Sequence, residues 1–166
     1  MSSPEKNKII IVDDHPIMQK GLAMTLENEI EFEIIGLFSS AEELLKEIDN
    51  LSADLAIVDI SLPGMSGLEL TKHLVATQPN LKILVLSRHD ELLYATRVLK
   101  AGAKGYLMKI EAGERLIKAL YKIVNGGIYV SPKVNEKMLR GIAINGTALA
   151  DSLEILSDRE LEVFQA

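Results

Sequence analysis

Four short apolar segments of this sequence each end in side chains that can bind a cation or a phosphoryl group. These side chains are Asp13, Asp14, Asp59, Ser87 and Lys109. Short β-rich apolar segments separated by helical patterns are typical of a parallel sheet that is covered on both faces. Ligands of such sheets bind outside the carboxyl ends of the strands. We therefore expect three carboxylates, a hydroxyl group and an ammonium group to lie together at one edge of a sheet.

This set of groups is suited to phosphoryl transfer that depends on a divalent cation. Carboxylates that lie close together repel one another unless a cation neutralises them, and Mg²⁺ binds oxygen ligands while keeping several waters. A carboxylate can attack phosphorus and form an aspartyl phosphate. A hydroxyl and an ammonium group can each bind a phosphoryl oxygen. Taken singly, Asp13 and Asp14 also fit a solvated helix start. Ser87 also fits a plain strand-end hydroxyl, and Lys109 fits a solvated lysine.

Five strands with helices between them would position these groups. The expected strands span residues 8–13, 32–38, 55–59, 81–87 and 105–108. Pro16 suits the first turn of the first helix. Ser40 and Glu43 form a capping box for the second helix, and Gly126 suits the end of the last one. Because connections between parallel strands are almost always right-handed, the expected fold is α/β, a doubly wound five-stranded parallel sheet in a three-layer sandwich.

The pattern changes after residue 127. Residues 128–132 form an extended stretch, and a short amphipathic helix follows it. The apolar face of this helix is expected to contain Val134, Met138, Leu139 and Ile142. Residues 141–151 are rich in Gly, Asn, Ala and Thr, which predicts a flexible linker.

A second capping box, made by Ser157 and Glu160, opens a further helix near the end of the sequence. A helix of about ten residues with no partner to pack on is marginal in water, so it is interpreted as the beginning of another domain. The predicted organisation is a first domain at 1–127, a linker with a short helix at 128–152, and an incomplete domain at 153–166.

Composition narrows the function classes further. The chain has 166 residues, no cysteine and a net charge of −6, which excludes disulfides and argues against nucleic-acid binding by the visible chain alone. The longest apolar runs are far shorter than the ~20 residues of a membrane-spanning helix. The first eight residues are polar and lack the apolar part of a signal peptide. We therefore expect a cytoplasmic protein without membrane contact.

Several motifs resemble the receiver domain of two-component response regulators. They lie at 11–15, 58–67 and 101–109, together with Ser87. The resemblance covers roughly residues 8–125, and all five signature positions are filled in order. It implies a CheY-like (flavodoxin-like) fold with strand order 2-1-3-4-5, followed by a helical linker.

One branch of the family is particularly similar. The Asp-His-Pro start of the first motif and the whole of 101–109 resemble the NarL/FixJ branch. The segment 156–164 resembles the first helix of the LuxR-type helix-turn-helix domain that this branch carries. DNA would then be bound only through that C-terminal domain, because the helix that enters the major groove is not part of this sequence.

The resemblance assigns an acceptor and a cation site. Asp59 is the expected phosphoacceptor. Asp14, Asp59 and the backbone carbonyl of Ser61 are the expected Mg²⁺ ligands, with Asp13 acting through a water molecule.

The resemblance also assigns groups that respond to phosphorylation. Ser87 is the expected switch hydroxyl, Lys109 pairs with the phosphate, and Tyr106 fills the aromatic switch position. Tyr106 also fits an ordinary strand tyrosine. Ser61 and His89 are expected to tune the rate of dephosphorylation, although an exposed loop histidine is the simpler interpretation of His89.

Two positions depart from the usual receiver pattern. Ser87 stands where threonine is commoner, which loosens control of the side-chain rotamer. Ile110 stands where many receivers have proline. A cis peptide bond after Lys109 is therefore in doubt, because cis bonds before other residues cost ~3 kcal/mol.

The expected function is that of a response regulator in a two-component phosphorelay that controls transcription. Its expected partners are a sensor histidine kinase, DNA through the C-terminal domain, and a second copy of itself in a phosphorylation-linked homodimer. The chain would be no enzyme beyond catalysing its own phosphorylation and dephosphorylation.

Two other functions fit parts of the sequence. A stand-alone receiver could act as a phosphocarrier through protein contacts, without DNA. A Mg²⁺-dependent aspartyl-phosphate phosphatase is the third possibility, but the Asp59-Ile60-Ser61 segment lacks the second carboxylate that would serve as its general acid.

Overall fold

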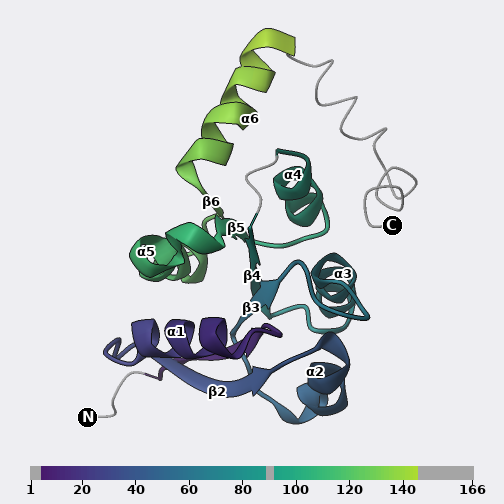
Figure 1. Ribbon diagram of the computed structural model, residues 1–166, viewed down its shortest axis with the longest axis vertical. Coiled ribbons are helices and arrows are strands. Elements are labelled where there is room, and N and C mark those ends of the chain that lie inside the picture. Colours follow the sequence, from purple (N-terminus) through teal and green to yellow (C-terminus); the bar gives the residue numbers. More distant parts are fainter. Residues whose placement is uncertain (1–4, 89–91, 146–166) are drawn as a thin grey trace.

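The computed structural model describes residues 5–88 and 92–145, which form a parallel sheet between two layers of helices (Figure 1). The strands are β1 (Asn7–Val12), β2 (Phe32–Phe38), β3 (Leu55–Asp59), β4 (Lys82–Ser87), β5 (Gly105–Met108) and β6 (Tyr129–Val130). The helices are α1 (Pro16–Leu26), α2 (Ala41–Glu47), α3 (Gly67–Thr77), α4 (Leu92–Lys100), α5 (Ala112–Val124) and α6 (Pro132–Asn145), with short 3-10 helices η1 (Ile48–Asn50) and η2 (Lys109–Glu111). The strand order is β2-β1-β3-β4-β5-β6. The predicted α/β class and the order 2-1-3-4-5 are confirmed, with a sixth strand added at one edge.

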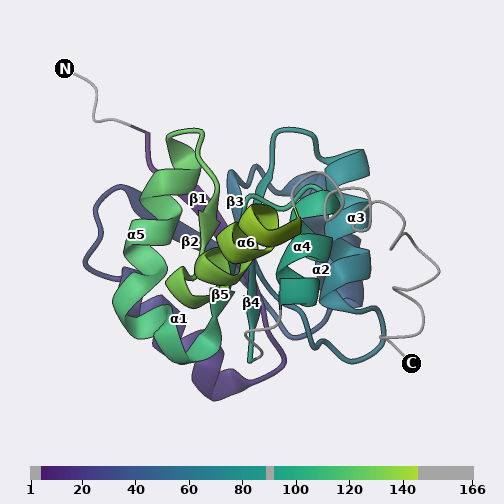
Figure 2. The ribbon, with the colours of Figure 1, turned by 90° about the horizontal axis from the view of Figure 1, so that it is seen from above.

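Both faces of the sheet are buried. Figure 2 shows α1 and α5 on one face, and α2, α3 and α4 on the other. Successive residues of a strand point to opposite faces. Accordingly, Ile9 and Ile11 of β1 pack with α1 and α5, whereas Ile10 and Val12 pack on the other side. All four side chains are fully buried, which explains why β1 is a continuous apolar segment.

Local hydrogen bonds set the starts of α2 and α3. The Ser40 hydroxyl accepts a hydrogen bond from the Glu43 amide, and the Glu43 carboxylate accepts one from the Ser39 amide. The predicted capping box is confirmed, with the return bond one residue earlier than in the standard motif. Ser66 caps α3 in the same way through the Glu69 amide.

The register of the strands brings their carboxyl ends level. Val12 lies beside Val58, so the residues that follow β1 meet the end of β3. Asp59 pairs with Leu86, one residue before the end of β4. Ser87 pairs with Met108, directly before Lys109. The polar groups predicted from the strand ends therefore lie along one edge of the sheet.

The expected sheet of five strands is corrected to six. Residues 128–132 were expected to be extended, and part of this stretch pairs with β5 as the parallel strand β6. The amide of Tyr129 donates to the Lys104 carbonyl, and the amide of Ser131 donates to the Tyr106 carbonyl. An edge strand offers unpaired backbone groups, and the chain that leaves α5 passes directly alongside them.

Helix α6 is longer than the sequence pattern predicts. The helix continues to Asn145, so the flexible linker expected from residue 141 does not begin there. Val134 is fully buried and Met138 packs partly on the core, as expected, but Leu139 is 59% exposed. The reason is visible in Figure 1, where α6 extends away from the sheet beyond β6, so only its beginning has a core to pack against.

Some predictions concern parts that the structure does not describe. The side chain of Ile142 and the helix expected after Ser157 lie outside the described residues. The domain boundaries at 127 and 152 stay predictions. Among the described residues, no helix combines the length and apolar character needed to cross a bilayer.

Candidate functional site

Three carboxylates meet at the carboxyl edge of the sheet, as predicted. Asp13 and Asp14 follow β1, and Asp59 is the last residue of β3. The residues Asp13 and Asp59 are each 1% exposed, whereas the side chain of Asp14 is 31% exposed. Together with His15, the three aspartates offer ligand atoms that all lie within 4.8 Å of one another.

Lys109 contacts two of these three aspartates. Its Nζ lies 3.0 Å from Asp59 Oδ2 and 3.1 Å from Asp13 Oδ2. The side chain is only 10% exposed, so water screens these contacts poorly. Lys109 occupies this position because β5 ends level with β3 and continues into η2. One ammonium group therefore faces two buried carboxylates.

The remaining carboxylate oxygens fit a hard divalent cation. Asp13 Oδ2 and Asp14 Oδ1 are buried and lack a well-oriented hydrogen bond, although each has a charged or imidazole nitrogen at 3.1 Å. Each nitrogen is close enough for charge attraction but is not aligned for a hydrogen bond to the oxygen. Carboxylate oxygens of neighbouring residues are hard ligands of the kind that bind Mg²⁺. The residues present therefore fit the cation that the sequence predicts.

The loop after β3 is held in place at both ends. The amide of Ser61 donates to Asp59 Oδ1 at 3.0 Å, which orients the carboxylate. Gly67 packs so closely that a Cβ there would lie 2.2 Å from the Asp59 carbonyl oxygen. Glu42 of α2 accepts a hydrogen bond from the Met65 amide, and this bond lowers the pKa of the Glu42 carboxyl. The loop that carries Ser61 is thus fixed relative to Asp59 and to α2.

The predicted switch residues lie at the same edge or directly behind it. Ser87 ends β4 and is fully buried. Tyr106 is also fully buried and belongs to the core cluster that contains Ala95 and Val98 of α4. His89 lies outside the described residues. The individual roles of Ser61, Ser87 and Tyr106 stay predictions.

Sequence reasoning missed two residues of the site, His15 and Arg88. His15 Nδ1 lies 3.1 Å from Asp13 Oδ1 and 3.1 Å from Asp14 Oδ1, and its Nε2 lies 3.0 Å from Arg88 Nη2. Both residues directly follow predicted site residues in the chain, which was the available signal. Gln19 was missed as well, although its side chain supports the loop after β1 by donating to the carbonyls of Asp13 and Phe38.

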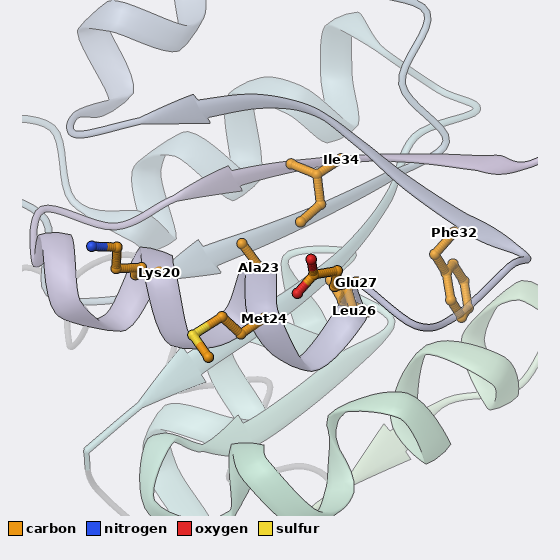
Figure 3. A pocket seen from close by; sticks show the side chains of 7 residues that line it. All are labelled: Lys20, Ala23, Met24, Leu26, Glu27, Phe32 and Ile34. Atoms are coloured by element: carbon orange, nitrogen blue, oxygen red, sulfur yellow. The ribbon is translucent and has the colours of Figure 1, made fainter.

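A separate hollow of about 410 Å³ lies between α1 and β2 (Figure 3). It is lined by Lys20, Ala23, Met24, Leu26, Glu27, Phe32 and Ile34. These residues come from α1, from Glu27 directly after it and from the beginning of β2, and none of them is one of the three aspartates of the site. We assign this hollow no part in the site.

The fold and the site together define the class of protein. Residues 9–121 match the model of the response regulator receiver domain. The chain therefore belongs to the response regulator receiver family, and its fold is the CheY-like fold.

Curated relatives place the chain near LuxR-type regulators. It is 33% identical to the transcriptional regulatory protein DegU of Brevibacillus brevis over 96% of this chain and 74% of the relative. It is 34% identical to the oxygen regulatory protein NreC of Staphylococcus carnosus over 94% of this chain and 74% of that relative.

Solved structures of response regulators are also similar to this chain. The isolated receiver domain of RcsB from Salmonella enterica serovar Typhimurium, with the phosphomimetic BeF3⁻, superposes with a TM-score of 0.75 at 29% identity, covering 80% of this chain and 98% of that one. A LuxR-family response regulator from Aurantimonas gives a TM-score of 0.77 at 26% identity, covering 82% and 97%.

Proposed function

We propose that the chain accepts a phosphoryl group on Asp59 from a sensor histidine kinase, in a reaction that depends on Mg²⁺. The observation that carries the proposal is the position of Asp59, between the Asp13-Asp14 pair and the ammonium group of Lys109. Family membership supports phosphoryl acceptance in general. The choice of Asp59 rests on the resemblance of residues 58–67 to the receiver motif, and this geometry supports it.

The transfer is a displacement at phosphorus. A carboxylate oxygen of Asp59 attacks the phosphorus of the kinase phosphohistidine, and the P–O bond forms as the P–N bond breaks. The imidazole nitrogen leaves with the bonding electron pair. Lys109, now 3.0 Å from the carboxylate, pairs with a phosphoryl oxygen, and the Ser87 hydroxyl binds another.

Asp14, Asp59 and the Ser61 carbonyl would hold Mg²⁺ directly, and Asp13 would hold it through water. When bound, the cation neutralises charge that builds up on the phosphoryl oxygens. Phosphorylation then adds negative charge and acceptor oxygens at the sheet edge, which favours a state with Ser87 drawn inward. Tyr106, behind that edge, would change its packing in response.

We further propose that this change controls a LuxR-type DNA-binding domain and a homodimer in the cytoplasm. One solved relative is a complex of RcsB with DNA, and another contains RcsB dimers on DNA, which supports this output by analogy. The chain would turn over no substrate besides its own phosphoryl group.

The test is mass spectrometry after treatment with acetyl phosphate, with Mg²⁺ or with EDTA. The expected result is one added phosphoryl group on the wild-type chain in Mg²⁺ only, located on Asp59 by peptide mapping. Asp59→Asn should remain unlabelled. Labelling of Asp59→Asn to the wild-type extent would place the acceptor elsewhere, and release of phosphate from small phosphomonoesters over many turnovers would favour a phosphatase.

A further inference from the structure

The imidazole of His15 lies on the oxygens that a cation would need. Nδ1 is 3.1 Å from Asp13 Oδ1, 3.1 Å from Asp14 Oδ1 and 3.8 Å from Asp59 Oδ2. The backbone holds the residue in this place, because the His15 amide also donates to Asp13 Oδ1 at 2.9 Å. Pro16 begins α1 directly afterwards, and a residue before proline is restricted to extended backbone conformations, which His15 adopts.

Arg88 determines which ring nitrogen carries the proton. Its Nη2 lies 3.0 Å from His15 Nε2. A guanidinium group can only donate hydrogen bonds, so Nε2 accepts and the hydrogen of the neutral ring is on Nδ1. That N–H points toward the carboxylates. In this arrangement Nδ1 has no lone pair for a cation, so His15 occupies the site without being a ligand in it.

The same ring covers the acceptor carboxylate. Asp59 is 1% exposed, although it lies at the edge of the sheet where a phosphodonor must arrive. The His15 side chain, 43% exposed, lies 3.8 Å from Asp59 Oδ2, and Arg88, which contacts the ring, is exposed as well. Lys109 contacts the same oxygen at 3.0 Å, so the His15 ring is one of two side chains that shield Asp59 from the solvent.

We propose that His15, held by Arg88, competes with the divalent cation for Asp13 and Asp14 and closes the site until the cation displaces it. This inference rests on the cation site of the proposed function. It adds that two residues from different loops, following β1 and β4, set the cation affinity and thereby how readily the site opens.

The decisive measurement is Mn²⁺ binding followed by electron paramagnetic resonance on the full chain without a phosphodonor. Mn²⁺ serves as the probe because it takes the same oxygen ligands as Mg²⁺. His15→Ala should bind Mn²⁺ about fivefold more tightly, the factor that corresponds to one displaced hydrogen bond. His73→Ala, at an exposed histidine of α3, is the matched control and should bind as the wild type does. Thermal unfolding of each variant confirms that it is folded.

Arg88→Ala tests the holding contact and keeps the proposal testable if His15→Ala does not fold. It should also tighten Mn²⁺ binding, and Arg140→Ala, at an exposed arginine of α6, should not. Because loss of a positive charge can itself favour a cation, the double variant is needed. If Arg88 acts through His15, its replacement has no further effect in the His15→Ala background; a full effect there would overturn its holding role.

The remaining outcomes of the Mn²⁺ measurement separate this proposal from the cation site on which it rests. Weaker Mn²⁺ binding by His15→Ala would show that the imidazole is a ligand and overturn the proposal. Unchanged binding would overturn it while leaving the cation site intact. No Mn²⁺ binding by any of these proteins would overturn the cation site as well, and with it the Mg²⁺ dependence of the proposed function.

Discussion

The hydroxyl of Ser131 accepts a hydrogen bond from the backbone amide of Met108, at 3.1 Å, one residue before Lys109. Ser131 also donates its own amide to the Tyr106 carbonyl, and its carbonyl accepts from Asn135 in the first turn of α6. The segment that leaves the receiver sheet is thus attached to the strand that carries Lys109 and Tyr106. A shift of β5 at the site would be transmitted directly to the start of α6.

Removing this attachment should cost stability. Ser131 is fully buried, so Ser131→Ala leaves the Met108 amide without its acceptor, and we expect a loss of about 1–3 kcal/mol in the free energy of unfolding. Urea denaturation followed by circular dichroism measures it. Ser52→Ala, at an exposed position, should change little. Equal stability of Ser131→Ala and wild type would show that the hydrogen bond contributes nothing net.

Replacing Gly67 or Gly21 by alanine should change the free energy of unfolding in opposite directions. Gly67→Ala places a Cβ 2.2 Å from the Asp59 carbonyl oxygen, so the backbone at the acceptor must shift. We expect a loss of about 3 kcal/mol and slower labelling by acetyl phosphate.

Gly21→Ala is the matched comparison. Gly21 lies within α1, and a Cβ there meets no atom within 4 Å apart from its chain neighbours and the backbone of its own helix. Alanine should therefore stabilise the protein by about 0.5–1 kcal/mol and leave labelling unchanged. The same sign of stability change for both variants would contradict the packing that the structure shows around Gly67.

The hydrogen bond between Glu42 and the Met65 amide should make stability depend on pH. In the folded protein this bond lowers the pKa of the Glu42 carboxyl below its ordinary value of 4.5. The stabilising contribution of the bond is therefore fully present above pH 4.5 and is lost as the pH falls through the lowered pKa. The stability difference between wild type and Glu42→Gln should therefore be largest near neutral pH and disappear in acid. Urea unfolding across this range measures it.

The control for this pH dependence is Glu47→Gln, at an exposed position of the same helix. It should follow the wild-type pH profile throughout. A Glu42→Gln profile parallel to that of the wild type down to acid pH would mean that the carboxylate charge does not matter to the loop.

Divalent cations should stabilise the folded chain through the acidic group. Binding only to the folded state adds about 2.7 kcal/mol when the free cation is a hundredfold above its dissociation constant. Mg²⁺ should therefore raise the unfolding temperature and EDTA should reverse the rise. Asp14→Asn should lose most of this response, and Asp49→Asn, at an exposed position of η1, should keep it. An equal Mg²⁺ response in both variants would exclude Asp14 as a ligand.

The main features of the site could be predicted because they depend on strand ends. Asp13, Asp59 and Lys109 come from three parallel strands whose carboxyl ends must meet at one edge, so identifying the strands was enough to bring these residues together. The capping box at Ser40 was equally accessible, since its partners are three residues apart.

What the sequence determined by itself was therefore the class of fold, the edge of the sheet and the charged groups on it. The tertiary structure alone decided the contact between His15 and Arg88, which are 73 positions apart, the pairing of β6 with β5, and the exposure of Leu139. The physical reason is that periodicity and capping are local properties of the chain. Which side chain covers a site, or which edge a returning segment pairs with, depends on the relative positions of distant segments after the chain has folded.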